Sequence, residues 1–129
     1  MNRSEVTPRK KRVIIESPFG RRVDGTPCSP AEIERNTRYV RRAVADSLRR
    51  GEAPFASHAL YPLVLDDATP AERRMGMEAG FAWGEAAHVI AVYADHEVTD
   101  GMVDGFERHK AAGIPFEYRY IGAEPELLP

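Results

Sequence analysis

Two carboxylates each follow an apolar run that is short enough to be a buried strand. Glu16 comes directly after the run 13–15, and Asp95 comes directly after the run 89–94. A carboxylate at the end of a buried strand is costly to desolvate unless a cation pairs with it or it faces a cleft. Glu16 and Asp95 are therefore candidate catalytic groups, for proton transfer or for stabilising a cationic transition state. An ion pair between Glu16 and a nearby arginine is the alternative.

A second group of polar side chains lies in the segment 57–67, which is otherwise largely apolar. It contains His58, Asp66 and Asp67. An unperturbed histidine titrates at about pH 6.5, which suits a general acid or base. We predict that Asp66 is catalytic and that His58 and Asp67 bind substrate. A hydrogen-bonded structural role is the alternative for His58.

Two further loops carry groups that bind polar ligands. Residues 17–19 follow Glu16 and offer a hydroxyl and backbone N–H groups to a sugar or phosphate. Residues 99–102 open a helix, whose free N–H groups favour an anionic or hydroxyl-rich ligand. The alternative interpretation of 99–102 is an ordinary N-cap with a close-packing glycine. The residues assigned to substrate binding from these loops are Ser17, Pro18, Phe19, Thr99, Gly101 and Met102.

Signatures of a metal, a cofactor or an activated nucleophile are missing from the sequence. The four histidines have no metal-ligand spacing, and Cys28 is the only cysteine. No Gly-rich phosphate loop, dinucleotide fingerprint or nucleophile elbow is present. We therefore predict no metal and no cofactor.

The elements that must position these residues alternate along the chain. Strands are predicted for 13–16, 54–57, 89–94 and 115–121, and helices for 29–50, 69–85 and 99–113. Alternating strands and helices favour a three-layer α/β fold of the flavodoxin or Rossmann kind, with about four mainly parallel strands and helices on both faces. Ligands of such sheets bind beyond the carboxyl ends of the strands. This rule selects the loops 16–22, 57–67 and 95–102 as the candidate site.

The helix predicted for 69–85 carries a stripe of glycines. Gly76, Gly80 and Gly84 are four residues apart, so one face has no side chains. Each glycine destabilises a helix by roughly 1 kcal/mol relative to alanine, so something must approach this face closely. A packed helix or strand is one candidate and a ligand is the other. Glu78 on the same helix is assigned to substrate binding, with an ion pair as the alternative.

Length and composition predict a single domain. The chain has 129 residues, and 43% of them are hydrophobic, which is enough for an ordinary folded core. We expect a domain at 11–122, between a disordered tail at 1–10 and a C-terminal tail at 123–129. No apolar run approaches the length of a membrane span, and no signal peptide is apparent, so a cytoplasmic protein is expected.

Charge is distributed unevenly along the chain. The net charge is −2, which predicts no general attraction to nucleic acid or to a membrane surface. Residues 35–50 nevertheless contain six arginines, whereas residues 65–107 contain ten acidic residues and two arginines. This complementarity favours self-association, and we expect a homo-oligomer, a dimer or larger.

Several motifs together resemble the nucleoside 2-deoxyribosyltransferase-like superfamily, and most closely its small branch found in actinobacteria and their phages. The resemblance extends over about residues 12–121, and the joint order of the motifs is more specific than any one of them. The motifs are Ile14-Ile15-Glu16-Ser17-Pro18-Phe19-Gly20, Arg49-Arg50-Gly51-Glu52-Ala53-Pro54-Phe55-Ala56-Ser57-His58, Leu65-Asp66-Asp67, Pro70 with Glu72-Arg73 and Gly76, and Asp100-Gly101-Met102 before Ala112-Gly113-Ile114-Pro115.

This resemblance implies a flavodoxin-like sheet, a nucleoside or nucleotide as ligand, and sites built at subunit interfaces. It also implies a nucleophilic glutamate a few residues into the helix that starts near Thr99. In this chain that position is Gly105. Family-type catalysis would then need another carboxylate, and the candidates are Glu16, Asp66, Asp67, Glu78, Asp95 and Asp104.

Two functions follow as expectations. The first is an enzyme that transfers or hydrolyses the N-glycosidic bond of a nucleoside or nucleotide, because a carboxylate can stabilise the sugar cation. The second is a catalytically degenerate nucleotide-binding protein, a sensor or sequestering protein, because Gly105 carries no nucleophile. A partner-binding module is the third alternative.

Overall fold

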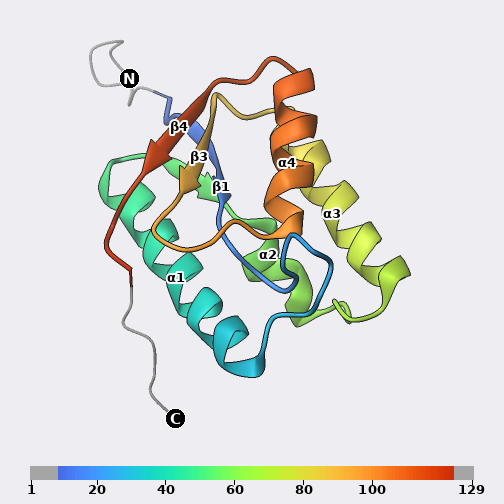
Figure 1. Cartoon of the computed structure of the whole chain (residues 1–129). Coiled ribbons are helices and arrows are strands. Elements are labelled where there is room, and N and C mark those ends of the chain that lie inside the picture. Colours follow the sequence, from blue (N-terminus) through green and yellow to red (C-terminus); the bar gives the residue numbers. More distant parts are fainter. Residues whose placement is uncertain (1–8, 124–129) are drawn as a thin grey trace, which may run out of the picture.

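Four parallel strands form the centre of the molecule (Figure 1). The structure is a computed structural model, and it describes residues 9–123. The strands are β1 (Arg12–Glu16), β2 (Ala53–Phe55), β3 (Val89–Tyr93) and β4 (Phe116–Arg119), in the spatial order β2-β1-β3-β4. In the register of the sheet, Ile14 lies beside Phe55 of β2 and Ile90 of β3. The predicted four-stranded parallel sheet is confirmed.

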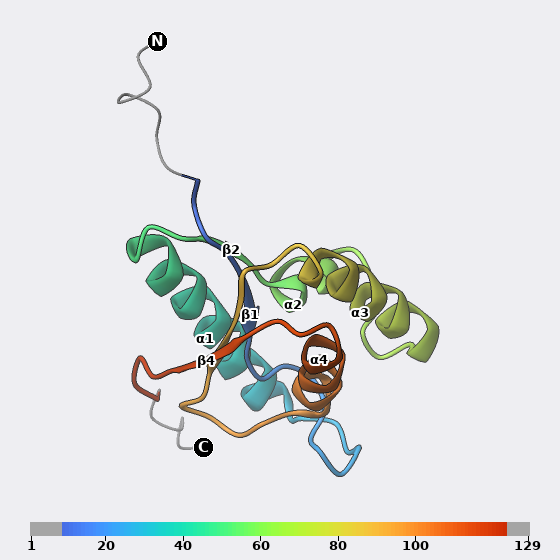
Figure 2. The same cartoon turned by 90° about the horizontal axis from the view of Figure 1, so that it is seen from above.

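Helices cover both faces of this sheet. Seen from above, α1 (Pro30–Arg49) lies on one side, and α3 (Pro70–Gly84) and α4 (Asp100–Ala111) lie on the other (Figure 2). A short helix α2 (Ser57–Leu60) and a 3-10 turn η2 (Tyr61–Leu63) connect β2 to α3. The predicted three layers are therefore present. No helix within the described part of the chain has both the length and the apolar character needed to cross a bilayer.

Two apolar clusters hold the layers together, one on each face. Val13 and Ile15 of β1 face α1 and contact Tyr39 and Val40, whereas Ile14 faces the opposite side. There Ile14 packs with Ile90, Val92 and Met102. Because alternate residues of a strand point to opposite faces, a strand covered on both sides must be apolar throughout. This explains the uninterrupted runs in β1 and β3.

The helix starts are built in two ways. Ser29 and Glu32 form the predicted capping box, since Ser29 Oγ accepts from Glu32 N at 3.1 Å and Glu32 Oε1 accepts from Ser29 N at 2.9 Å. Thr69 and Thr99 are N-caps by position, but neither side chain bonds to its own helix. The hydroxyl of Thr99 instead accepts from Phe19 N at 3.3 Å. This contact ties the loop after β1 to the start of α4.

Two predicted strands differ from the observed strands by more than one residue at an end. The second strand is Ala53–Phe55 and not 54–57, because Ser57 already begins α2. The last strand is Phe116–Arg119 and not 115–121. It ends early because the carboxylate of Asp95 accepts from Ile121 N at 2.8 Å and from Gly122 N at 2.9 Å, which draws the chain away from β3.

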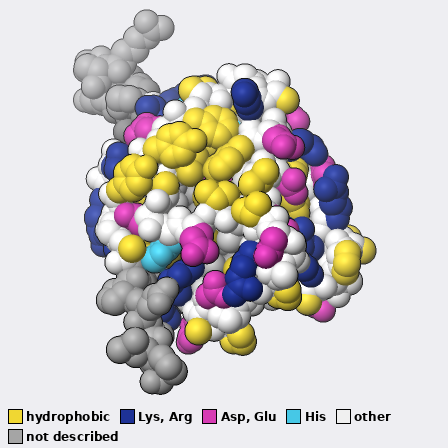
Figure 3. All heavy atoms as spheres, viewed as in Figure 1, with side chains coloured by type: hydrophobic (Ala, Val, Ile, Leu, Met, Phe, Trp, Pro, Cys, Tyr) yellow, Lys and Arg dark blue, Asp and Glu magenta, His cyan; other side chains and the backbone are white. Residues whose placement is uncertain are grey.

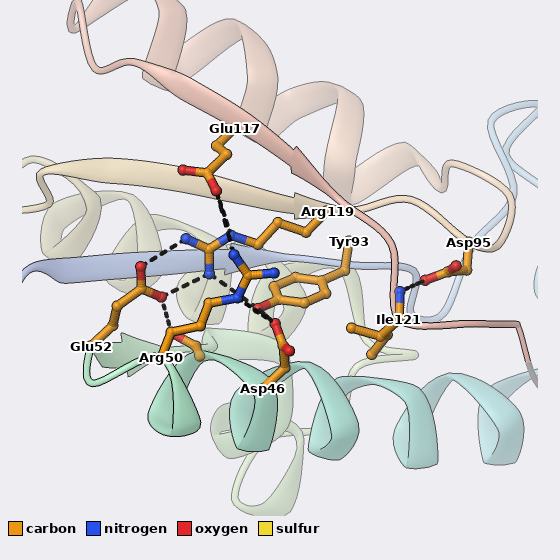
Figure 4. Close-up of polar contacts among 9 residues, drawn as sticks. Asp46, Arg50, Glu52, Tyr93, Asp95, Glu117, Arg119 and Ile121 are labelled. Atoms are coloured by element: carbon orange, nitrogen blue, oxygen red, sulfur yellow. Dashed lines mark hydrogen bonds and ion pairs between the residues drawn. The ribbon is translucent and has the colours of Figure 1, made fainter.

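A buried arginine anchors β4 to the face covered by α1 (Figure 4). Arg119 donates to both carboxylate oxygens of Glu52, at 2.7 and 2.8 Å, and to the hydroxyl of Tyr93 at 3.1 Å. Asp46 of α1 accepts from the same tyrosine at 2.8 Å. Arg119 lowers the pKa of Glu52 by this bidentate contact. The edge strand is thus fixed by charge as well as by the sheet ladder.

Candidate functional site

A pocket opens beyond the carboxyl ends of the strands, on the face covered by α3 and α4. It has a cavity volume of about 90 Å³ and is partly open to solvent. Its walls come from the loops after β1, β2 and β3 and from both helices. The predicted site residues that line it are Glu16, Ser17, Phe19, His58, Asp67, Thr99, Gly101 and Met102. The three loops selected from the sequence therefore meet at one place.

Four residues assigned to the site lie elsewhere. Pro18 is fully buried and does not line the pocket. Asp66 caps the start of α3, where it accepts from Ala68 N at 3.0 Å and from the Thr69 hydroxyl at 2.9 Å. It is held outside the pocket because its carboxylate satisfies these local donors.

Asp95 and Glu78 are also engaged away from the pocket. Asp95 lies on the α1 side, where it accepts from the hydroxyl of Tyr39 at 2.6 Å in addition to the two backbone N–H groups that end β4. Glu78 lies on the outer surface between Arg74 and Arg108, with a nitrogen to oxygen distance of 3.2 Å to each. The alternative interpretation of Glu78, as a member of an ion pair, is the one that the structure supports.

Glu16 and His109 form a polar pair at the pocket floor. Glu16 Oε1 is 3.1 Å from His109 Nε2, and the two side chains are only 13% and 4% exposed. Burial raises the pKa of Glu16, and the contact with His109 opposes this shift only in part. A buried carboxyl with a raised pKa that is hydrogen-bonded to an imidazole is suited to proton transfer.

Two glycines make room for this pair. A β carbon at Gly105 would lie 2.5 Å from Glu16 Oε1, and one at Gly84 would lie 2.5 Å from His109 Cε1. Real Cβ contacts essentially never come so close, so either substitution must displace a side chain. Gly105 thus admits the carboxyl of Glu16 to the face of α4.

Ser17 and His58 form a second polar pair on the pocket wall. Ser17 Oγ lies 2.6 Å from His58 Nε2. Desolvation of the ring lowers the pKa of His58 to about 4, so the imidazole is neutral at physiological pH. A neutral ring nitrogen can accept the hydroxyl proton of Ser17, which leaves the Ser17 oxygen free to accept a hydrogen bond from a ligand.

The rim of the pocket combines charges of both signs. Arg73 of α3 pairs with Asp100 of α4, with Nη2 2.7 Å from Oδ1. Asp67 approaches the loop after β1, where a β carbon at Gly20 would lie 2.8 Å from Asp67 Oδ2. Burial raises the pKa of Asp67, although Arg73 and Arg21 oppose the shift. The rim therefore offers carboxyl groups and a guanidinium to a ligand that enters the pocket.

The glycine stripe of α3 is filled from within the chain. A β carbon at Gly76 would lie 3.4 Å from both Tyr61 and Leu65, Gly80 faces the side chain of Ser57, and Gly84 faces His109. The close approach expected from the sequence is therefore made by η2, α2 and α4. A second subunit has no room to use this stripe.

His109 and Arg73 are pocket residues that the sequence analysis did not select. His109 shares the buried face of α4 with Met102 and Gly105, at spacings of three and four residues. A histidine placed on an apolar face next to a glycine is a signal that the sequence does contain. Arg73 gives no comparable signal, because its role depends on the approach of α3 to α4. Within residues 9–123, no group of three or more His, Cys, Asp or Glu side chains is arranged to hold a metal ion.

The model of a protein family described as a domain of unknown function, DUF7768, matches residues 11–119. No curated protein matches the chain.

Proposed function

Because the chain belongs to the DUF7768 family, whose description names no activity, we propose a function from the pocket itself. The protein binds a nucleoside or nucleotide there and breaks or transfers its N-glycosidic bond. The proposal rests on the pocket and on the resemblance to the nucleoside 2-deoxyribosyltransferase-like superfamily. Its ligand is a small molecule and not a nucleic acid, because the net charge of −2 gives no general attraction to nucleic acid.

The observation that carries the proposal is the position of the Glu16 carboxyl. The resemblance implies a reacting glutamate at the position of Gly105. The carboxyl of Glu16 lies against Gly105, within the space that a side chain at 105 would enter. Glu16 therefore supplies, from the end of β1, the functional group that α4 lacks.

In this proposal each polar pair has a task. In hydrolysis, water adds to the anomeric carbon, and the C–N bond breaks with its electron pair leaving on the base. The base takes up a proton as it leaves, and the carboxyl of Glu16 is the donor, with His109 holding it in place. The proton that the added water loses returns to the carboxylate of Glu16. Ser17 and His58 bind a sugar hydroxyl. Thr99 and Gly101, at the start of α4, lie beside the leaving base, because a helix N-terminus favours the negative charge that develops on it.

Binding without turnover is the second candidate function. One observation favours it: Glu16 is desolvated and already bonded to His109. The raised pKa favours the protonated form of Glu16, which cannot attack the sugar as a nucleophile. A sensor or sequestering protein would use the same pocket and the same contacts.

The test measures release and binding separately. Nucleosides and nucleotides with each common base are incubated with the protein, and free base is followed by chromatography. The same panel is screened for an increase in melting temperature, which any ligand of the native state produces. Glu16→Gln should abolish release and retain binding. Glu78→Gln, which removes an exposed carboxylate outside the pocket, is the matched control and should change neither.

Each outcome has one meaning. Base release that depends on Glu16 supports the enzyme. A thermal shift without release by the wild-type protein supports the binding protein. Neither release nor a shift across the whole panel contradicts both functions.

A cytoplasmic location completes the proposal. Cys28 is a free, buried thiol, and thiols persist in reducing compartments. Nucleosides and nucleotides are also metabolised there. Fractionation of cells that produce the tagged protein would test this location.

A further inference from the structure

Among residues 9–123, the outer edge of β4 has no strand beside it. β4 is the last strand in the sheet order, and within this part of the chain it pairs only with β3 (Figure 1). The carbonyls of Pro115 and Arg119 accept from Ile90 N and Ala94 N of the β3 segment, at 2.9 and 3.0 Å. Because backbone groups alternate in direction along a strand, those of Phe116, Tyr118 and Tyr120 point away from the sheet. An exposed edge of this kind is a template for another strand.

The opposite edge of the sheet is protected. β2 has three residues, and its central residue is Pro54, which has no N–H to donate. Short edge strands and edge prolines are devices that prevent strand pairing. β4 has no proline within Phe116–Arg119. The two edges therefore differ, and only β4 is suited to pairing.

Aromatic side chains are exposed beside this edge. Tyr118 and Tyr120 are 60% and 68% exposed, and Phe116 packs edge-on against Phe106 of α4, with 5.8 Å between ring centroids. Figure 3 shows hydrophobic side chains gathered over β4 and toward α4. We call Phe116, Tyr118 and Tyr120 the aromatic edge. Such a patch next to unpaired backbone groups marks an interaction surface.

We propose that the aromatic edge pairs with the aromatic edge of a second copy of this chain. The two β4 strands run antiparallel about a two-fold axis through Tyr118, and the two sheets become one continuous sheet. In this register Tyr118 lies opposite the partner's Tyr118, and Phe116 lies opposite the partner's Tyr120. These are the residues whose N–H and C=O groups point outward, as hydrogen-bonded pairs of an antiparallel ladder require.

The charges on the other face of β4 fit the same register. Glu117 would lie opposite the partner's Arg119. Glu117 is 45% exposed, and Arg50, 42% exposed, approaches it at 3.7 Å. Arg119 itself is 2% exposed and bonded within its own chain, so each copy brings one exposed carboxylate with an exposed arginine beside it to the axis, and no unpaired like charges meet across the two-fold. A two-fold interface must be complementary to itself in this way.

The test uses position 118, because the two-fold axis places the side chains at position 118 of the two copies next to each other. Tyr118→Lys places two cations side by side, and Tyr118→Glu places two anions side by side. Each should raise the dissociation constant of the dimer at least about tenfold, a loss of about 1.4 kcal/mol. An equimolar mixture of the two variants should regain the dimer as a heterodimer. Mass is measured by light scattering after size exclusion, and folding by circular dichroism.

A control and a second measurement separate the outcomes. Leu63→Lys, at a residue of η2 that is 78% exposed, should leave the dimer unchanged. In the wild-type chain, hydrogen exchange at the amides of Tyr118 and Tyr120 should be slow at high concentration and accelerate on dilution. A wild-type monomer at every accessible concentration overturns the proposal. A dimer that tolerates both Tyr118 variants, or a mixture that fails to reassociate while both variants stay folded, overturns it as well.

Discussion

The carboxyl of Glu16 and the backbone of Gly105 are in direct contact at the pocket floor. Strand β1 delivers the carboxyl, and helix α4 leaves the space for it. The approach is so close that a β carbon at Gly105 would lie within 2.5 to 3.1 Å of three atoms of the carboxyl group. Position 105 carries no carboxyl of its own because it is a glycine, and the missing side chain leaves the space that the carboxyl of Glu16 occupies.

Gly105→Ala should therefore destabilise the protein, although alanine favours helix. Displacement of Glu16 is expected to cost about 1 to 3 kcal/mol, against a gain in helix propensity of about 1 kcal/mol. Urea denaturation measures the net loss in the free energy of unfolding. Gly101→Ala, in the same helix, is the control, because its β carbon would meet only Arg73 Nη2 at 3.8 Å.

A double variant tests the cause of this destabilisation. Adding Glu16→Ala to Gly105→Ala should recover part of the lost stability, since the clash is removed. A double variant whose loss equals the sum of the two single losses would show that the residues are not coupled.

Glu16→Gln should change how stability depends on pH. The pKa of Glu16 is raised in the folded state by burial. Below the ordinary pKa of 4.5 the carboxyl is protonated in both states, and its contribution to stability is complete. As pH rises above 4.5 the unfolded chain ionises first, so this contribution is lost.

Glutamine cannot ionise, so the variant should gain stability relative to wild type as pH rises through this window. Urea midpoints measured across the pH series give the comparison. If the variant instead loses stability relative to the wild type as pH rises, His109 stabilises an ionised Glu16, and the carboxyl is not a proton donor.

His58→Gln should remove a pH dependence of the opposite sign. Burial lowers the pKa of His58 from 6.5 to about 4. Above pH 6.5 the ring is neutral in both states and its contribution is complete; as pH falls toward 4 the unfolded chain takes up the proton first, and stability is lost. The loss is at most about 3 kcal/mol.

The measurement for His58 is the melting temperature between pH 7 and pH 4. The wild type should lose stability over this interval more steeply than the variant, because glutamine takes up no proton. His88→Gln is a control for the general effect of removing a histidine. Equal slopes for the wild type and His58→Gln would mean that the ring of His58 is solvated.

The fold could be predicted because its signals are local. Apolar runs mark β1 and β3, and the Ser29 capping box marks the start of α1. The end of β4 could not be predicted, because it depends on Asp95, which is distant in sequence and captures the N–H groups of Ile121 and Gly122.

The positions of the strand ends predict that the pocket lies beyond the carboxyl ends of the sheet, but they do not predict which face of the sheet it lies on. Glu16 has the same parity as Ile14 and faces α4, whereas Asp95 has the same parity as Tyr93 and faces α1. One rule therefore selected both carboxylates, and only one of them reached the pocket. His109 enters the pocket because Gly84 of another helix makes room for it. No local pattern contains that information.

Glu52→Gln should lower the free energy of unfolding by more than the substitution of an exposed charged residue does. Arg119 is 2% exposed and Glu52 is 12% exposed at the side chain, and two hydrogen bonds join them. Removing the charge of Glu52 leaves the buried Arg119 with the half-exposed Glu117 as its remaining bonded carboxylate, at a cost of about 3 kcal/mol. Glu117→Gln is the matched control, because Glu117 contacts the same arginine but is 45% exposed. It should cost no more than about 1 kcal/mol. Urea denaturation of both variants at neutral pH decides between them, and similar losses would mean that Glu52 does not anchor β4.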